Sequence, residues 1–130
     1  MAIPFNRRQI VLGIGIFYAA IGLLGLVPGA MVATGQGGQA VLFGWLGTSA
    51  ALGAVHLALG LIALLASQAR VAPRQPLLGL AAAFALLVGG SLVAPVAVAL
   101  GLNGADTVLH LVSLLATAGL GLAEPERATA

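Results

Sequence analysis

The chain has 130 residues, of which 61% are hydrophobic and 6% are charged, and its formal net charge is +2. Its mean hydropathy is +1.15. Soluble domains carry about 25% charged residues, so a chain of this size could not hide so much apolar surface from water. Five arginines against three acids, spread along the chain, argue against a nucleic-acid partner. The absence of cysteine excludes disulfides, thiolate metal sites and catalytic thiols.

Four apolar segments are long enough to cross the hydrocarbon core, which requires about 20 residues in a helix. They are residues 10–27, 41–66, 77–100 and 105–123. Unbroken apolar runs of this length are typical of membrane helices and lack the alternation of barrel strands. The sequence therefore predicts a single all-α membrane domain over residues 1–130, folded as a compact antiparallel four-transmembrane-helix bundle.

The connections between these segments have loop composition. Val27–Gln39 is rich in glycine, Ser67–Pro76 holds two arginines and two prolines, and Ala99–Ala105 reads as a tight turn. Pro95 lies inside the third segment, where it is expected to kink the helix or to end its regular part early.

The arginines predict the orientation of the chain. Arg7 and Arg8 precede the first segment, Arg70 and Arg74 lie in the second loop, and Arg127 follows the fourth segment. All five fall on one side of the membrane, which the positive-inside rule makes cytoplasmic. Both termini are therefore expected in the cytoplasm.

The N-terminal stretch "NRRQIVLGIGIF" also has features of a twin-arginine export signal, with an arginine pair before an apolar run. Cleaved signals have an apolar core of about 7–15 residues and an A-x-A-like site. Here the run is longer and no clear site follows, so a retained first span is the preferred interpretation.

Small and polar residues recur at a spacing of three or four in each segment, which places them on one helix face. The first segment has Gly15, Tyr18, Gly22 and Gly25; the second has Ser49, Gly53, His56, Gly60, Ala63 and Ser67; the third has Gly79, Ala83, Leu86, Gly90 and Ala94. These faces are expected to meet inside the bundle, with Gly22, Gly25, Gly53, Gly60 and Gly90 as the helix-packing glycines.

The fourth segment has the most polar face, formed by Asn103, Asp106, His110, Ser113 and Thr117. Asp106 and His110 are four residues apart, so their side chains can touch on a helix. Ionisable groups inside a membrane are costly and are treated as a functional-site hypothesis by default.

Depth indicates which polar groups can meet. At about 1.5 Å per residue, His56 and His110 both lie about 20 Å from the cytoplasmic boundary, and Tyr18 lies about 15 Å from it. The predicted polar intramembrane cluster therefore comprises Asn103, Asp106, His110, His56 and Tyr18.

Three interpretations of this cluster stay open. In the first, Asn103 or Asp106 caps the fourth helix, Asp106 holds His110, and His56 bonds a carbonyl or hydroxyl. In the second, the cluster is a proton or ion relay or a pocket for a small polar molecule. In the third, His56 and His110 together bind a haem or a metal ion, although two histidines and one carboxylate make a thin ligand set.

Motif searches add no enzyme chemistry. The chain has no phosphate-binding loop, no H-E-x-x-H and no G-x-S-x-G, and the glycine pair at Gly13 and Gly15 follows no strand. We expect no cofactor on this basis, with haem or metal kept as the alternative at the two histidines. The runs "VHLALGLIALLA" and "LHLVSLLATAGL" are similar enough to suggest two helical hairpins related by an internal repeat.

Several stretches together resemble a known family. "LLGLVPG", "LFGW", "VHLALGLIALL" and "LNGADTVLHLVSLLA" occur in this order, and the most specific pattern is Asn103, Asp106 and His110, followed by His56 with Gly60. In these features the chain, from about Gln9 to Leu122, resembles the bacterial membrane proteins catalogued as domain of unknown function 4383. The resemblance implies a four-helix protein of the bacterial inner membrane and no assigned activity.

These observations favour a non-enzymatic, structural or accessory membrane protein of unknown biochemical role. The alternative is a small redox or proton-relay membrane protein that uses His56 and His110. The expected partners are the lipid bilayer and a second copy or another membrane protein, because a small glycine-rich bundle leaves packing faces.

Overall fold

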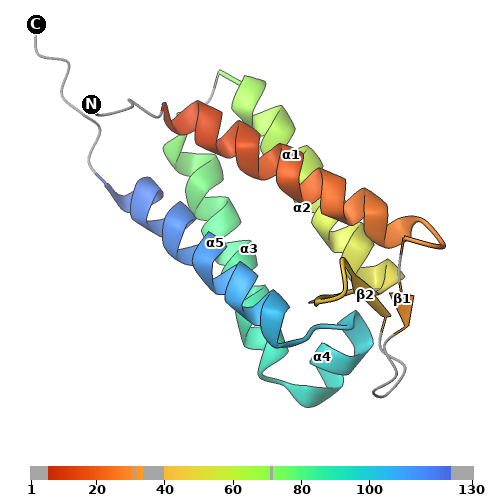
Figure 1. Ribbon diagram of the computed structural model, residues 1–130. Helices are drawn as coiled ribbons and strands as arrows, with labels where there is room; N and C mark the ends of the chain where they lie inside the picture. The colour runs from red at the N-terminus through yellow and green to blue at the C-terminus, as the bar shows by residue number, and fades with distance from the viewer. Residues whose placement is uncertain (1–5, 31, 34–39, 71, 124–130) are drawn as a thin grey trace, which may run out of the picture.

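Four long helices dominate the computed structural model, which describes residues 6–30, 32–33, 40–70 and 72–123 (Figure 1). They are α1 (Arg7–Leu26), α2 (Ala50–Gln68), α3 (Arg74–Ser91) and α5 (Gly104–Leu122). Each has the length and hydropathy needed to cross a membrane. The predicted class, an all-α protein with four membrane-spanning helices, is therefore confirmed.

The long helices associate as two antiparallel pairs, α1 with α2 and α3 with α5 (Figure 1). Glycines bring the first pair together. A Cβ atom on Gly22 would collide with the backbone of Leu57, and one on Gly60 would collide with the backbone of Ala19. The two backbones are therefore in contact at these points, which only glycine permits.

The end of this seam is equally tight. A Cβ on Gly25 would lie 3.1 Å from the Cα of Gly53 and 3.0 Å from the Oγ1 of Thr48. The expected packing glycines of α1 and α2 thus lie at the contact between these two helices.

The buried face of α3 differs from the expected one. Its buried residues are Leu77, Leu80, Ala81, Phe84 and Leu87. The expected small-residue face points outward: Gly79 and Ala94 are exposed, Leu86 is 78% exposed, and a Cβ on Gly90 would approach only Val96. The physical reason lies on the partner helix. Small and polar residues of α5 leave space, and the large side chains of α3 fill it, because close van der Waals packing is what stabilises contacts between membrane helices.

A small sheet precedes α2, so the second helix begins at Ala50 and not at residue 41. Strands β1 (Val32–Ala33), β2 (Ala40–Leu42) and β3 (Leu46–Gly47) pair antiparallel in the order β1-β2-β3. Positive φ angles at Phe43 (55°) and Gly44 (81°) turn the chain between β2 and β3. Ser49 then caps α2 by accepting a hydrogen bond from the N–H of Leu52, 3.0 Å away.

The third predicted segment, residues 77–100, is two helices in the structure. After α3 ends at Ser91, α4 (Ala94–Leu100) follows with Pro95 in its first turn. Proline lacks an N–H group and fits only the first turn of a helix, so Pro95 ends the regular part of the span as expected.

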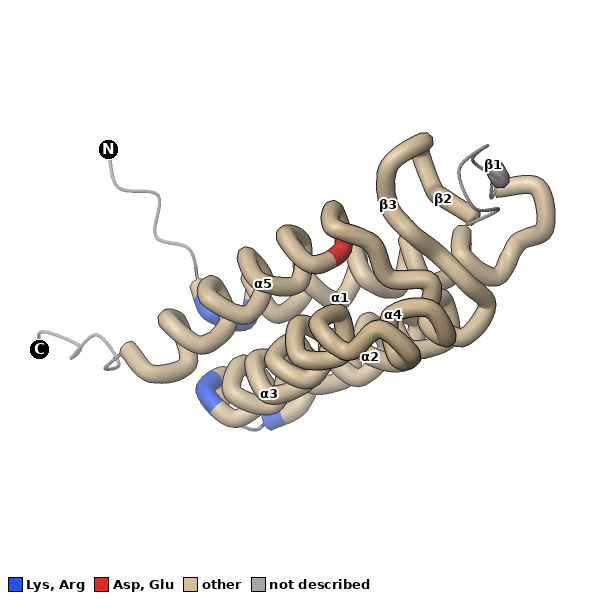
Figure 2. Tube along the Cα trace, turned by 90° about the horizontal axis from the view of Figure 1, so that it is seen from below, with Lys and Arg blue, Asp and Glu red and all other residues tan. Residues whose placement is uncertain are grey.

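Basic residues gather at one end of the molecule, away from Asp106 at the start of α5 (Figure 2). Arg7 donates a hydrogen bond to the carbonyl of Ala123, and Arg8 donates to the carbonyls of Ser67 and Ala69. These contacts place positive charge at the C-terminal ends of α5 and α2, where it is favoured by the helix dipole. Arg127 and residues 34–39 of the predicted first loop lie outside the described residues.

Candidate functional site

A cluster of four rings lies in the core, one ring from each long helix. Tyr18 (α1), His56 (α2), Phe84 (α3) and His110 (α5) are all buried, and we refer to them as the four-ring cluster. The ring centroid of Tyr18 lies 5.3 Å from that of His56 and 4.8 Å from that of Phe84. Phe84 and His110 are 6.3 Å apart and nearly parallel. These separations are typical of interacting aromatic rings, so the cluster joins the two helix pairs.

The two histidines contact each other directly. The Nε2 atoms of His56 and His110 lie 2.9 Å apart, which is a hydrogen-bond distance. His56 is 5% exposed and His110 is fully buried. Such a bond requires that one Nε2 atom carries a hydrogen and the other does not, so the two rings hold opposite tautomers while both are neutral.

The other ring nitrogen of His110 identifies which tautomer is favoured. Its Nδ1 atom is buried and has no hydrogen-bond partner, the single side-chain nitrogen or oxygen atom in this condition among the described residues. A buried N–H without a partner is rarer in proteins than an acceptor with a vacant lone pair. The arrangement therefore favours a hydrogen on Nε2 of His110, which donates to His56, and a bare Nδ1.

The second polar group of the site surrounds Asp106, which is 1% exposed. Its Oδ2 atom accepts a hydrogen bond from the N–H of Asn103 at 2.8 Å, and its carboxylate also accepts from the backbone of Gly47. Asn103 donates from Nδ2 to the carbonyl of Trp45 at 2.9 Å. We call these two side chains, with the backbone of Trp45 and Gly47, the Asp106 network.

Local sequence explains this network. Asn103 is the N-cap of α5: its Oδ1 accepts from the N–H groups of Ala105 and Asp106, while Asp106 reaches back to the N–H of Asn103. This is a capping box, with the carboxylate at the positive end of the helix dipole. Gly47 is required because a Cβ there would lie 2.6 Å from Oδ2 of Asp106 and would collide with the carbonyl of Gly101. The β2–β3 hairpin is thereby attached to the start of α5.

The remaining hydroxyls have mixed roles. Tyr18 and Ser113 share a hydrogen bond of 2.7 Å between α1 and α5. Ser49 donates to the carbonyl of Leu100 at 2.7 Å and so links α2 to α4. Thr117 is buried but donates to the carbonyl of Ser113 within its own helix, so it joins no second helix.

The residues expected to form one polar cluster thus separate into two groups. Asn103 and Asp106 belong to the network at the start of α5, while Tyr18, His56 and His110 belong to the ring cluster. The expected contact between Asp106 and His110 is replaced by backbone donors to the carboxylate, and His56 bonds His110 and not a carbonyl or hydroxyl.

Phe84 and Gly47 were missed by sequence reasoning. Phe84 lies on the apolar face that α3 buries, with Leu77, Leu80 and Leu87 at helical spacing, and this spacing is the sequence signal that predicts it. Gly47 lies in a segment predicted as helix, where nothing pointed to a contact with residues far along the chain.

Comparison with known proteins identifies the family. The model of the family described as "Domain of unknown function (DUF4383)" matches residues 8–123. The chain therefore belongs to this family, as its resemblance implied, and is a membrane protein whose role the family does not define. No curated protein and no solved structure matches the chain.

Proposed function

We propose that this protein is a structural or accessory component of a bacterial cytoplasmic membrane and does not catalyse a reaction. The observation that supports this most is the Asp106 network, in which both polar side chains are used to fix the hairpin against α5. Polar groups that are fully engaged inside the protein specify packing and leave little to bind a substrate. Lipid and a second copy or another membrane protein are the proposed partners.

We also propose that both termini face the cytoplasm. Arg7 and Arg8 bond the C-terminal ends of α5 and α2, and Arg70 and Arg74 lie between the end of α2 and the start of α3. The basic segments therefore gather at one end of the molecule (Figure 2), which is the distribution that the positive-inside rule expects. The chain has no cysteine, so single cysteines report orientation without background. In intact cells, an impermeant maleimide should label Ala99→Cys and not Gln75→Cys. The reverse pattern would invert the proposed topology.

A second candidate function rests on the paired histidines, because two imidazoles bonded through Nε2 can pass a proton from one ring to the other. The arrangement would suit a step in a proton relay through the membrane. Proton flux in vesicles that is lost in both His56→Gln and His110→Gln would support this function over the structural one.

The same pair fits a bound haem or metal less well. The two Nε2 atoms are 2.9 Å apart and bonded to each other, and the one that carries the hydrogen has no lone pair to offer a metal ion. Four-coordinate metal sites draw on three or four protein ligands, and the described residues contain no group of three His, Cys, Asp or Glu side chains that could hold an ion. We therefore derive no chemistry through such a group.

One experiment separates the structural proposal from a cofactor protein, while the proton-flux measurement above tests the relay. Protein purified in mild detergent from its native membrane is compared with His110→Ala by absorption spectroscopy, metal analysis and thermal unfolding. The structural proposal expects a lower melting temperature for the variant and identical, colourless, metal-free spectra. A Soret band or stoichiometric metal that disappears in the variant would make this a cofactor protein.

A further inference from the structure

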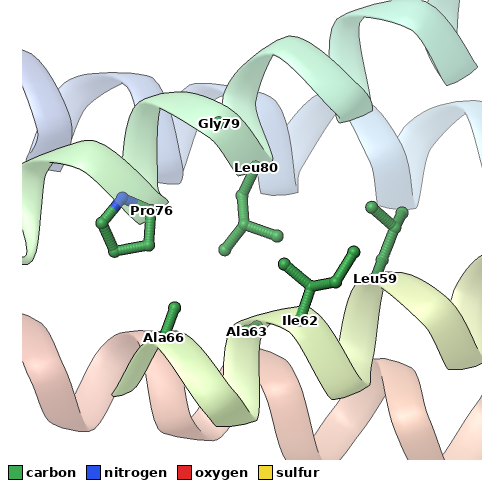
Figure 3. Close-up of a pocket in the computed structure, with 7 residues that line it drawn as sticks. All are labelled: Leu59, Ile62, Ala63, Ala66, Pro76, Gly79 and Leu80. Carbon is green, nitrogen blue, oxygen red and sulfur yellow. The ribbon is translucent and has the colours of Figure 1, made fainter. Parts of the chain in front are cut away.

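An apolar groove runs between α2 and α3 on the outside of the molecule (Figure 3). It has a volume of about 220 Å³, and its walls are Leu59, Ile62, Ala63 and Ala66 from α2 with Pro76, Gly79 and Leu80 from α3. This is smaller than the roughly 300–1,000 Å³ of typical small-molecule sites. The groove is also almost without polar groups, so a slender apolar occupant fits it best.

The helix packing explains why the groove exists. Although α2 and α3 are consecutive in the chain, α2 packs mainly against α1 and α3 packs mainly against α5. Where the two helices pass each other, small residues form much of the wall. A Cβ on Gly79 would meet no atom within 4 Å, so the space beside it is open.

The groove is long enough to hold part of an acyl chain. From Leu59 to Ala66 the wall on α2 extends about 10 Å along the helix. Figure 3 shows Ala66 and Pro76 facing each other at one end of the groove and Leu59 with Leu80 toward the other. The first end is next to the loop that joins α2 and α3.

Two arginines lie near the end of the groove that is formed by Ala66 and Pro76. Arg70 lies four residues after Ala66, just beyond the end of α2, and Arg74 precedes Pro76 by two residues. Both arginines are exposed, and neither forms an ion pair with another described residue. Guanidinium groups are well suited to phosphate because they offer several N–H donors in one plane. Basic groups next to a gap between membrane helices are the arrangement that binds anionic lipid headgroups.

We propose that the α2–α3 groove is a binding site for one anionic phospholipid, with an acyl chain in the groove and its phosphate against Arg70 and Arg74. Charge complementarity selects this occupant, since an uncharged or zwitterionic lipid would gain less from two arginines that form no ion pair with another described residue. The lipid would fill the gap between the two helix pairs and join them on the outside, as the four-ring cluster does inside. This proposal does not depend on the role of the histidines.

Native mass spectrometry of the purified protein tests the site, with phosphatidylglycerol or phosphatidylethanolamine added at equal concentration. Wild type should retain phosphatidylglycerol several-fold more than phosphatidylethanolamine. Gly79→Leu should fill the groove and lower the retention of both lipids. Gly89→Leu is the matched control, because Gly89 lies on the same helix, outside the groove, and also has open space around it.

The double variant Arg70→Gln/Arg74→Gln tests the charge separately. Both positions are exposed, so it should fold as wild type does and should reduce phosphatidylglycerol to the level of phosphatidylethanolamine. Equal retention of the two lipids by wild type, or wild-type retention by Gly79→Leu, would overturn the proposal. A dimer mass that disappears in Gly79→Leu would show instead that a second copy occupies the groove.

Discussion

The two polar regions of this protein differ in how fully their buried polar groups are hydrogen-bonded. At the start of α5, the buried carboxylate of Asp106 is matched by backbone donors from Asn103 and Gly47. In the core, His56 and His110 have only each other among the described polar groups, and Nδ1 of His110 has no partner. In the first region, every hydrogen bond of the carboxylate joins the hairpin to α5 or caps the helix. The second region is a pair of histidines among apolar side chains, and one nitrogen of this pair has no hydrogen-bond partner among the described residues.

This contrast predicts different costs of disruption. Removing the acceptor from a fully hydrogen-bonded network leaves its buried donors without partners. The free-energy cost of an unpaired buried donor is larger than the net stabilisation from an average hydrogen bond. Removing both members of an isolated pair leaves nothing unpaired. The loss of Asp106 should therefore lower the stability strongly, and the loss of both histidines should cost less than the sum of the two single losses.

The largest effect is expected for Asp106→Ala. It leaves the N–H groups of Asn103 and Gly47 without their acceptor, so the free energy of unfolding should fall by about 3 kcal/mol. Denaturant unfolding in detergent measures this. Asp106→Asn, which keeps one acceptor oxygen, should lose less, and an Asp106→Ala protein as stable as wild type would show that the network does not stabilise the fold.

The next largest effect is expected for Gly47→Ala. The added methyl group would push against Asp106 and the carbonyl of Gly101, and overpacking of this kind costs about 1–3 kcal/mol. Gly104→Ala is the matched control, because Gly104 is close by in the first turn of α5 and its Cβ would meet nothing within 4 Å. Equal melting temperatures for the two variants would count against a tight hairpin joint.

A smaller effect is expected at the histidine pair. His110→Leu removes the partner of Nε2 on His56, so it should cost about 1–2 kcal/mol. The double variant His56→Leu/His110→Leu should cost less than the sum of the two single variants, because each single variant leaves an unpaired nitrogen and the double variant leaves none. A double-mutant cycle measures the difference, and strict additivity would show that the two rings do not interact.

The smallest effect is expected for Tyr18→Phe. It removes only the hydroxyl that bonds Ser113, and such bonds between membrane helices are worth about 0.6 kcal/mol on average. Thermal unfolding of Tyr18→Phe, Ser113→Ala and the double variant should show that the second substitution adds little to the first. A loss of several kcal/mol would mean that this hydroxyl does more than pair with Ser113.

The number and class of the helices could be predicted because hydrophobic length and the cost of unpaired backbone in lipid leave few alternatives. The pairing of His56 with His110 could be predicted in part, because the two residues lie at equal depth in the membrane and can therefore meet. That depth argument could not give their distance or their tautomers, which depend on how the helices rotate against each other.

Other features were hidden for physical reasons. The apolar run that includes Val41 and Leu42 reads as helix, but positive φ angles at Phe43 and Gly44 turn it into a hairpin. The face that α3 buries was misjudged because small residues are favoured at some membrane helix contacts and large ones at others, and the choice is made by the partner helix. Here α5 is the small partner, so Phe84 and its neighbours fill the contact.

His56 and His110 share one hydrogen inside the buried four-ring cluster. Nitrogen NMR of protein labelled with ¹⁵N-histidine tests it most directly, because the shifts distinguish the tautomers and a coupling across the hydrogen bond joins its two nitrogens. We expect a hydrogen on Nε2 of His110, a bare Nε2 on His56, and a coupling between them that His56→Gln abolishes. Two rings in the same tautomer with no coupling, or shifts that indicate metal ligation, would contradict it.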